Sequence, residues 1–317
     1  MTVHEQFVDA ALLERWRDWI TPALARFGVT GFGADATGLS EQRLKALVTG
    51  DAILFTRAIE CDGVPRGLVV VTLAAWESGV LRRPVAKLAW LGADDFETAK
   101  TLVTASLDVA CERDVVLLSA SPGNSPTFIH VALTEAGFHL GSQALTMRAD
   151  LDLIAPELTR IPLRGSFREA TPADTESVVE LARHGFVDAR FTGDPFFPAE
   201  WGQALFAEWA RNLMRGAADS VIVAEVKGTV VGFVSMTLDA RRRAEVPVLL
   251  AIDRRYNGWG IGAMLVRLMF EWYIARGLKV FSGGTEKSNT PINAVYTRLG
   301  ATFSDANLVY HATPVRP

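Results

Sequence analysis

The sequence has few cysteines and no strong excess of charge of either sign. Its two cysteines, Cys61 and Cys111, offer neither a disulfide framework nor metal-ligand spacing. A reducing, cytoplasmic setting and no bound metal are therefore expected. The 32 basic and 36 acidic residues give a net charge of −4, without the basic footprint of a nucleic-acid-binding protein.

Long hydrophobic runs are also missing. No apolar stretch approaches the roughly 20 residues that a membrane-spanning helix needs, and no signal-peptide pattern is present. We therefore expect no membrane partner. The 317 residues are 49% hydrophobic, which is enough for two ordinary domains.

The most informative segment runs from an apolar strand into an amphipathic helix and alternates glycine with other residues. It reads Asn257-Gly258-Trp259-Gly260-Ile261-Gly262-Ala263. Glycines lack a Cβ atom and leave backbone N–H groups accessible, and a helix N-terminus adds a partial positive charge. The segment therefore predicts a binding site for a phosphorylated cofactor.

Two common nucleotide-binding motifs do not fit this segment. A dinucleotide-binding loop needs Gly-x-Gly-x-x-Gly near the start of a βαβ unit, whereas these glycines alternate and lie late in the chain. A P-loop needs Gly-Lys followed by Ser or Thr, which does not occur here. Another class of phosphate-binding loop is indicated.

Three further motifs accompany the glycine loop in a fixed order. The first is a short strand with a helix cap, in which Thr171 or Asp174 is a plausible N-cap. The second is a hairpin turning at Lys227-Gly228. The third places Asn289 seven residues before Tyr296, with Leu299-Gly300 directly behind.

In this order the four motifs resemble the GNAT N-acyltransferase superfamily. The resemblance implies an N-acetyltransferase that uses acetyl-CoA or another acyl-CoA, with the diphosphate on residues 257–263. It also implies a pantetheine arm in the splay between the strands Val248–Ile252 and Lys279–Gly283. The arm would lie beside Leu250, Ala251 and Ile252 and be hydrogen-bonded to Asn289. Asn257 departs from the family's usual Gln or Arg, which removes a long side chain but no backbone donor.

The resemblance also suggests catalytic roles. Tyr296 occupies the position of the family's general acid, although a tyrosine there could instead anchor the helix against the sheet. Glu245 is the best-placed carboxylate for a general base. A solvated strand end, a partner for the arginines at 241–243, or a water chain that carries the proton are the alternatives.

The acceptor is expected to bind an aromatic segment before the hairpin. The segment resembles the dTDP-fucosamine acetyltransferases, which acetylate a nucleotide-linked amino sugar, in its Arg-Phe loop, its Trp209–Asn212 step and its Arg215-Gly216 pair. Aromatic faces can stack on sugar or base rings, and Arg190, Arg211 or Arg215 could meet a diphosphate. The candidate substrate-binding residues are Arg190, Phe191, Asp194, Phe196, Phe197 and Trp209.

Other functions remain open at this point. The same scaffold could acylate a peptide, a polyamine or an antibiotic precursor, or the chain could be a non-catalytic acyl-CoA-binding module. The retention of Asn289 and Tyr296 in register argues against a non-catalytic module. We expect the partner to be a small-molecule amine. We expect the protein to be a monomer or a homodimer.

The first half of the chain is a faint repeat of the second. Hairpin, strand and closing-helix segments recur at offsets of 163 to 165 residues. At the place of the glycine loop the first copy has the carboxylates Asp94, Asp95 and Glu97, which would repel a diphosphate, and Leu133 replaces Tyr296. The first copy is therefore expected to be degenerate.

The predicted fold is α/β, with two tandem GNAT-like domains. Each domain would have a mixed, mostly antiparallel sheet flanked by helices. The predicted boundaries are residues 1–153 for the degenerate domain, 154–166 for a linker and 167–317 for the acetyltransferase domain.

Overall fold

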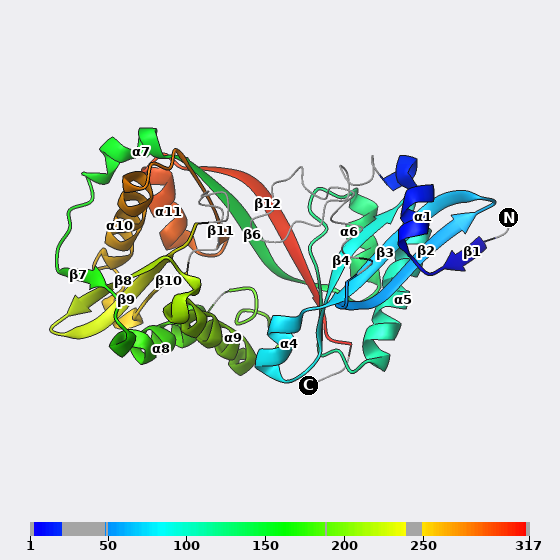
Figure 1. Ribbon diagram of the computed structural model, residues 1–317, viewed down its shortest axis with the longest axis horizontal. Helices are drawn as coiled ribbons and strands as arrows, with labels where there is room; N and C mark the ends of the chain where they lie inside the picture. The colour runs from blue at the N-terminus through cyan, green and yellow to red at the C-terminus, as the bar shows by residue number, and fades with distance from the viewer. Residues whose placement is uncertain (1–2, 21–47, 49, 188, 239–248, 315–317) are drawn as a thin grey trace. The chain divides into compact units, whose positions relative to one another are not determined.

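The chain divides into two compact units, one formed by residues 1–142 and 307–317 and the other by residues 143–306. The division differs from the predicted linker at 154–166, because residues 143–153 group with the second half and the C-terminal residues with the first. The computed structural model describes residues 3–20, 48, 50–187, 189–238 and 249–314 (Figure 1).

The first unit is built on an antiparallel meander. Strands β1 to β4 pair in sequence order and antiparallel, and β5 is parallel to β4. Trp90, Leu102 and Leu118 are among the buried residues of its core. The elements are β1 (Val3–Gln6), α1 (Ala10–Arg15), β2 (Ile53–Cys61), β3 (Val64–Leu73), α4 (Ala75–Leu81), β4 (Val85–Ala93), α5 (Phe96–Glu112), β5 (Leu117–Ala120) and α6 (Thr127–Glu135).

The second unit contains a four-stranded antiparallel sheet in the order β10-β9-β8-β7. Its strands are β7 (Ser166–Glu169), β8 (Ser220–Val226), β9 (Thr229–Met236), β10 (Leu250–Ile252) and, outside this sheet, β11 (Val280–Glu286). Its helices are α7 (Leu151–Leu158), η1 (Pro172–Asp174), α8 (Thr175–Gly185), α9 (Ala199–Asn212), η2 (Leu213–Ala217), η3 (Arg254–Tyr256), α10 (Ile261–Ala275) and α11 (Thr290–Arg298).

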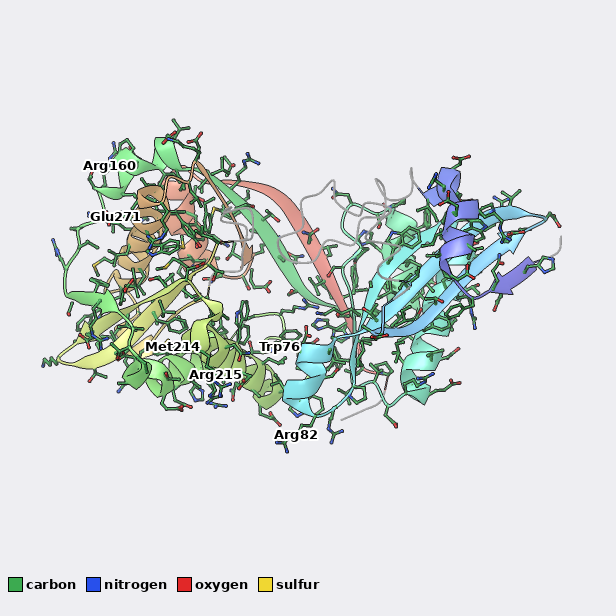
Figure 2. All side chains as sticks on the ribbon, viewed as in Figure 1. Trp76, Arg82, Arg160, Met214, Arg215 and Glu271 are labelled. Carbon is green, nitrogen blue, oxygen red and sulfur yellow. The ribbon has the colours of Figure 1, made fainter. Side chains whose placement is uncertain are left out.

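Helices cover both faces of that sheet, as predicted (Figure 1). Successive strand residues point to opposite faces. Phe233 therefore packs with α8 and α9, whereas Val234 packs with α10. Met214, labelled in Figure 2, lies against the α8 and α9 cluster at the end of α9. The strand ahead of the glycine loop is thus held between two apolar layers.

The predicted repeat is confirmed in the hairpins of both units. The β2–β3 turn has positive φ at Asp62 (49°) and Gly63 (79°), and the β8–β9 turn has it at Lys227 (51°) and Gly228 (75°). Two successive left-handed residues form the tight turn that suits the twist of paired strands. Each hairpin also has a register shift close to its turn, between Ile59 and Glu60 and between Ala224 and Glu225.

The last strand of each repeat pairs outside its own half of the chain. Strand β6 (His139–Asp150) follows the first unit's α6, yet its residues 144–150 pair antiparallel with β11. Strand β12 (Thr302–Ala312) follows the second unit's α11, yet its residues 310–312 pair with β5. The two repeats have therefore exchanged their final strands, which the sequence did not predict.

The predicted linker is partly ordered structure. Helix α7 includes residues 154–158, and Ile154 and Leu158 are 1% and 2% exposed in the core around α10. Asp150 caps the helix by accepting hydrogen bonds from Asp152 N (3.0 Å) and Leu153 N (3.3 Å). Pro156 falls inside the helix, where it lacks the backbone N–H that would bond the carbonyl of Asp152. Residues 154–158 therefore belong to the second unit's core, whereas most of residues 159–166 are exposed.

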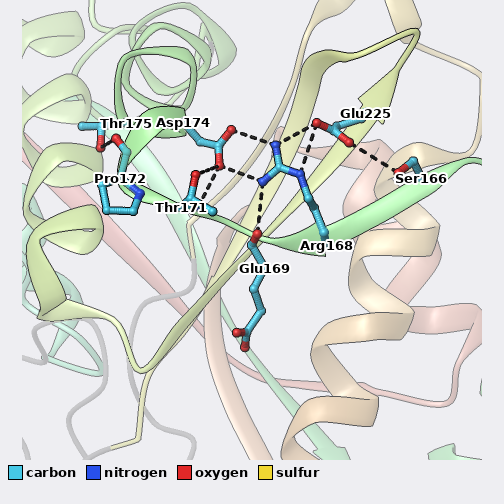
Figure 3. A network of polar contacts seen from close by, with 8 residues as sticks. All are labelled: Ser166, Arg168, Glu169, Thr171, Pro172, Asp174, Thr175 and Glu225. Carbon is cyan, nitrogen blue, oxygen red and sulfur yellow. Dashed lines mark hydrogen bonds and ion pairs between the residues drawn. The ribbon is translucent and has the colours of Figure 1, made fainter.

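An arginine network joins β7, β8 and the start of α8 (Figure 3). Arg168 donates two hydrogen bonds to Asp174, at 2.7 and 2.9 Å, and bonds Glu225 at 2.7 Å. Asp174 Oδ2 accepts from Thr171 N at 2.7 Å, so the two residues predicted as alternative N-caps form a capping box together. The network fixes the start of α8 against β7 and β8.

We expect this network to make stability depend on acid pH. The Arg168 guanidinium holds the pKa of the Asp174 carboxyl well below its usual range, and the hydrogen bonds from Thr171 act in the same direction, while burial opposes both. The unfolded chain has an Asp pKa of about 4. The stabilisation is therefore complete above that pH and is lost as the pH falls toward the folded-state pKa.

The test is Asp174→Asn, followed by thermal unfolding. At pH 7 we expect the Tm to fall by about 2 to 6 °C, and at pH 3 the difference from the wild type should shrink. Asp152→Asn is the control, because its ion pair with Lys279 is exposed on both sides (65% and 71%) and should contribute little. An equal Tm difference at both pH values would contradict the electrostatic explanation.

None of the helices in the described residues combines the length and apolar character needed to cross a membrane.

Candidate active site

The glycine loop links β10 to α10 in the second unit. Asp253 caps the short η3 turn by accepting a hydrogen bond from Arg255 N at 2.9 Å. Gly258 and Gly260 then take the left-handed conformation, with φ of 83° and 79°. A Cβ atom at either glycine would meet no neighbour, so both serve the backbone conformation rather than a close contact.

The third glycine has a different role. A Cβ atom at Gly262 would lie 2.9 Å from Ile252 Cδ1, which is closer than real contacts allow. Gly262 therefore lets the first turn of α10 pack directly on β10. The strand predicted to border the cofactor and the helix that would bind its phosphates are thus held together.

The loop presents backbone donors without partners. In the part of the chain that the structure describes, the N–H groups of Gly258, Gly260 and residues 261–263 make no hydrogen bond, and α10 has no side-chain cap. Trp259 N and Met264 N are paired with Tyr256 O and Gly260 O. Residues 257–260 are exposed. Donors at a helix N-terminus attract an anion, so the geometry fits the predicted phosphate site.

In the first unit, the helix N-terminus that corresponds to the glycine loop is the start of α5, and it is capped by the carboxylate of Asp95. Asp95 caps α5 and accepts a hydrogen bond from Thr98 N at 2.8 Å. Asp94 accepts a hydrogen bond from Trp19 Nε1 at 2.9 Å. A second anion would meet negative charge rather than free donors. The first unit is therefore degenerate at this site, as predicted.

Tyr296 lies in the last turn of α11 and is buried, with 6% of its surface exposed. Its ring packs against Phe270, with centroids 6.1 Å apart. Burial raises the pKa of Tyr296, and the neighbouring Tyr273 raises it further. The hydroxyl is therefore protonated at neutral pH, the state that a general acid requires.

Two residues near Tyr296 were missed by the sequence reasoning. Tyr273 on α10 donates a hydrogen bond to Thr237 O at 3.2 Å and fixes the end of β9. Asn293, one helical turn before Tyr296, donates from Nδ2 to Glu286 O at 3.1 Å, and its buried Oδ1 has no partner among the described residues. The spacing of Asn293, four residues after Asn289, was the available signal.

Asn289 is located where the sequence predicted a role in cofactor binding. It occupies the N-cap position of α11, and its side chain makes no capping hydrogen bond. Its backbone N–H is bonded to Glu286 O at 3.0 Å, which fixes it at the end of β11. The Asn289 side chain is therefore not used in capping the helix.

Strands β10 and β11 do not pair with each other. Leu250, Ala251 and Ile252 pair with β9, and β11 pairs with β6. Among the described strands, each is thus an edge strand whose other side carries backbone groups without a strand partner. Separated strands at this position agree with the predicted place of a pantetheine arm.

The predicted acceptor residues differ in burial and in their neighbours. Phe197 is buried, and its ring lies 5.8 Å from Phe191 and 5.4 Å from Trp201. Asp194 is also buried and accepts a hydrogen bond from Phe196 N at 2.9 Å, which shapes the loop. Phe197 and Asp194 therefore stabilise the loop itself.

The remaining predicted acceptor residues are less buried or pack against other elements. Phe196 is 58% exposed, and the guanidinium of Arg190 lies 5.0 Å from the centre of the Phe191 ring. Trp209 stacks on Phe206 at 6.2 Å in the α8 and α9 cluster. The roles of all six residues in binding an acceptor stay predictions.

The two further arginines suggested for a diphosphate are already paired. Arg211 bonds Glu208 at 3.0 Å, and Arg215 lies 3.4 Å from the same carboxylate. Glu245, the candidate base, lies in the segment 239–248, outside the described residues. That segment follows β9 in the chain, close to Thr237, which accepts the hydrogen bond from Tyr273.

Residues 188–301, which include the glycine loop and Tyr296, match the acetyltransferase (GNAT) family. The chain carries a GNAT acetyltransferase domain. This acetyltransferase is 24% identical over 259 residues to the spore coat polysaccharide biosynthesis protein SpsD of Bacillus subtilis, covering 78% of this chain and 84% of that one. It is 26% identical over 172 residues to a dTDP-fucosamine acetyltransferase of Escherichia coli O6:H1, covering 54% and 70% of the chains.

Solved structures support the tandem fold. A GCN5-related N-acetyltransferase from Sphaerobacter thermophilus matches this acetyltransferase with a TM-score of 0.62 at 15% identity, over 99% of this chain and 96% of that one. A tandem GNAT protein from the clavulanic acid biosynthesis pathway matches with a TM-score of 0.56 at 14% identity over 100% of both chains. The predicted fold of two GNAT-like domains is confirmed.

Proposed function

We propose that this acetyltransferase transfers an acyl group from acetyl-CoA, or another acyl-CoA, to the primary amine of a nucleotide-linked amino sugar. The observation that carries the cofactor assignment is the row of N–H groups at Gly258, Gly260 and residues 261–263, which have no hydrogen-bond partner among the described residues. The names of two relatives, one in polysaccharide biosynthesis and one acting on an amino sugar, support the acceptor class. The reaction would take place in the cytoplasm, in a monomer or homodimer.

The residues present fit a CoA thioester. The diphosphate would accept hydrogen bonds from the loop N–H groups, and the helix N-terminus would add favourable charge. Asn257 contributes no long cationic side chain, so the backbone would carry this contact. The pantetheine arm would lie beside Leu250, Ala251 and Ile252, with Asn289 as a hydrogen-bonding partner.

The bound thioester supplies an activated acyl group. Attack by the amine builds negative charge on the carbonyl oxygen and on the leaving sulfur. Tyr296 Oη would donate its proton to the sulfur as the carbon–sulfur bond breaks, because burial keeps the hydroxyl protonated. Glu245 or a water chain would take the proton from the attacking nitrogen.

Replacement of Tyr296 with phenylalanine tests the proposed acid. We expect Tyr296→Phe to lower kcat by about 100-fold or more, since general acid catalysis typically contributes 10²- to 10⁴-fold. Binding of acetyl-CoA should change little, because phenylalanine keeps the ring that packs on Phe270. Steady-state kinetics and calorimetric titration measure the two quantities.

Tyr273→Phe is the matched control, since Tyr273 is a neighbouring buried tyrosine whose hydroxyl bonds the backbone of Thr237. We expect Tyr273→Phe to lower the Tm, because a buried hydrogen bond is lost, and to leave kcat nearly unchanged. The raised pKa of Tyr296 also predicts no loss of rate from its deprotonation between pH 7 and pH 10. Full turnover by Tyr296→Phe would remove Tyr296 from the mechanism.

A thiol-release assay with acetyl-CoA tests the acceptor class. The panel contains nucleotide-linked amino sugars, the same amino sugars without the nucleotide, polyamines, a peptide amine and aminoglycosides. Turnover confined to nucleotide-linked sugars is the expected result. Turnover with a different amine would move the acceptor to that class, and CoA binding without turnover on any amine would favour an acyl-CoA-binding module.

A further inference from the structure

Trp259 is an exposed tryptophan in the middle of the glycine loop. It is 62% exposed, whereas Trp16, Trp90 and Trp272 are at most 8% exposed. Leaving a large apolar ring in water is unfavourable, and the exposed ring adds little to the core. The fold therefore gives no reason for a tryptophan at this position.

The ring is held in place by one neighbour. Trp259 meets Tyr256 edge to face, with centroids 5.2 Å apart and planes at 77°. An edge-to-face contact occupies one face of only one of the two rings, so the indole keeps at least one broad face open. Gly258 and Gly260 on either side take the left-handed conformation, which glycine adopts without steric cost. The open face is thus presented from a defined backbone.

The open face lies next to the unpaired donors. A diphosphate on Gly260 and residues 261–263 would bring the adenosine that follows it in CoA close to residue 259. Asn257 is too short to reach over the phosphates as an arginine would. The nucleotide end of the cofactor would therefore need another contact.

We propose that Trp259 stacks on the adenine ring of bound acyl-CoA and supplies the affinity for its nucleotide end. This inference rests on the proposed function. Stacking of a base on an aromatic side chain needs only a flat, accessible face, and it does not depend on the 3′-phosphate. Trp259 would therefore distinguish a CoA thioester from a donor that ends at the phosphopantetheine.

The full-length chain and three variants are titrated with CoA, 3′-dephospho-CoA and 4′-phosphopantetheine. Trp259→Ala should weaken the binding of CoA and of dephospho-CoA by the same factor, about 5- to 150-fold, as expected for the loss of one stack. It should leave 4′-phosphopantetheine unaffected. Trp259→Phe should retain most of the affinity, and Trp76→Ala, at an exposed tryptophan of the first unit (41% exposed, Figure 2), should change nothing.

Steady-state kinetics give a second readout. We expect Trp259→Ala to raise the KM for acetyl-CoA without changing kcat, because the adenine lies away from the reacting atoms. Wild-type affinity in Trp259→Ala, or an equal loss for 4′-phosphopantetheine, would overturn the stacking role while leaving CoA binding intact. Failure of the wild type to bind CoA would overturn the proposed function and this inference with it.

Discussion

Gly260→Asp is expected to abolish acetyl-CoA binding, with a loss of at least about 100-fold. The new carboxylate would stand at the N-terminus of α10, among the donors proposed to hold the diphosphate. Two negative charges about 4 Å apart repel by roughly 4 kcal/mol at the effective dielectric of a protein surface, which alone is a factor near 1,000. Calorimetric titration with acetyl-CoA measures the effect.

The same helix offers a matched control. Gly277 follows the other end of α10 with φ of 78°, almost the 79° of Gly260, and a Cβ atom at either position meets no neighbour. Gly277→Asp therefore carries the same backbone strain and the same charge at a distance from the loop. We expect it to bind acetyl-CoA normally. Equal losses in both variants would mean that strain, and not charge at the loop, explains the effect.

A fragment of residues 167–317 is expected not to fold, although it contains every motif of the acetyltransferase domain. It lacks residues 144–150 of β6, which pair along the whole of β11. It also lacks α7 and five buried core residues, Met147, Ala149, Leu151, Ile154 and Leu158. Burying each larger side chain contributes roughly 1.5 to 3 kcal/mol, so the loss rivals the total stability of a typical domain, about 5 to 15 kcal/mol.

The fragment 143–306 is the comparison, because it matches the second compact unit. We expect it to unfold cooperatively on heating and to bind acetyl-CoA through the glycine loop. Thermal unfolding by near-ultraviolet circular dichroism, which reports fixed aromatic side chains, distinguishes the two fragments. A cooperative transition in 167–317 would show that β6 and α7 are dispensable.

The predicted boundary at residues 154–166 differs from the division into compact units, which falls between residues 142 and 143. A strand with an apolar pattern, such as β6, has the same alternation whichever strand it pairs with. Its partner depends on contacts between residues far apart in the chain. The segment 154–166 was expected to be a linker because it contains prolines and a glycine, yet Ile154 and Leu158 are core residues.

Local motifs were predicted well because their chemistry is contained in a few neighbouring residues. The Asp62-Gly63 and Lys227-Gly228 turns need left-handed backbone, which their residue types favour. An N-cap at Thr171 or Asp174 was likewise predicted, and the structure shows that the two residues form a capping box. The degenerate first copy was also predictable, because Asp95 lies at the N-terminus of α5 and its carboxylate accepts the hydrogen bond from Thr98 N.

The sequence by itself determined the family resemblance, the two-fold repeat and the glycine loop with its alternating residues, since each depends on local spacing. Only the tertiary structure decided that β6 and β12 are exchanged, that Arg168 joins Asp174 to Glu225, and that Tyr296 is buried. It also showed that Arg211 and Arg215 already pair with Glu208. These features depend on long-range packing and charge pairing, which no short stretch of sequence specifies.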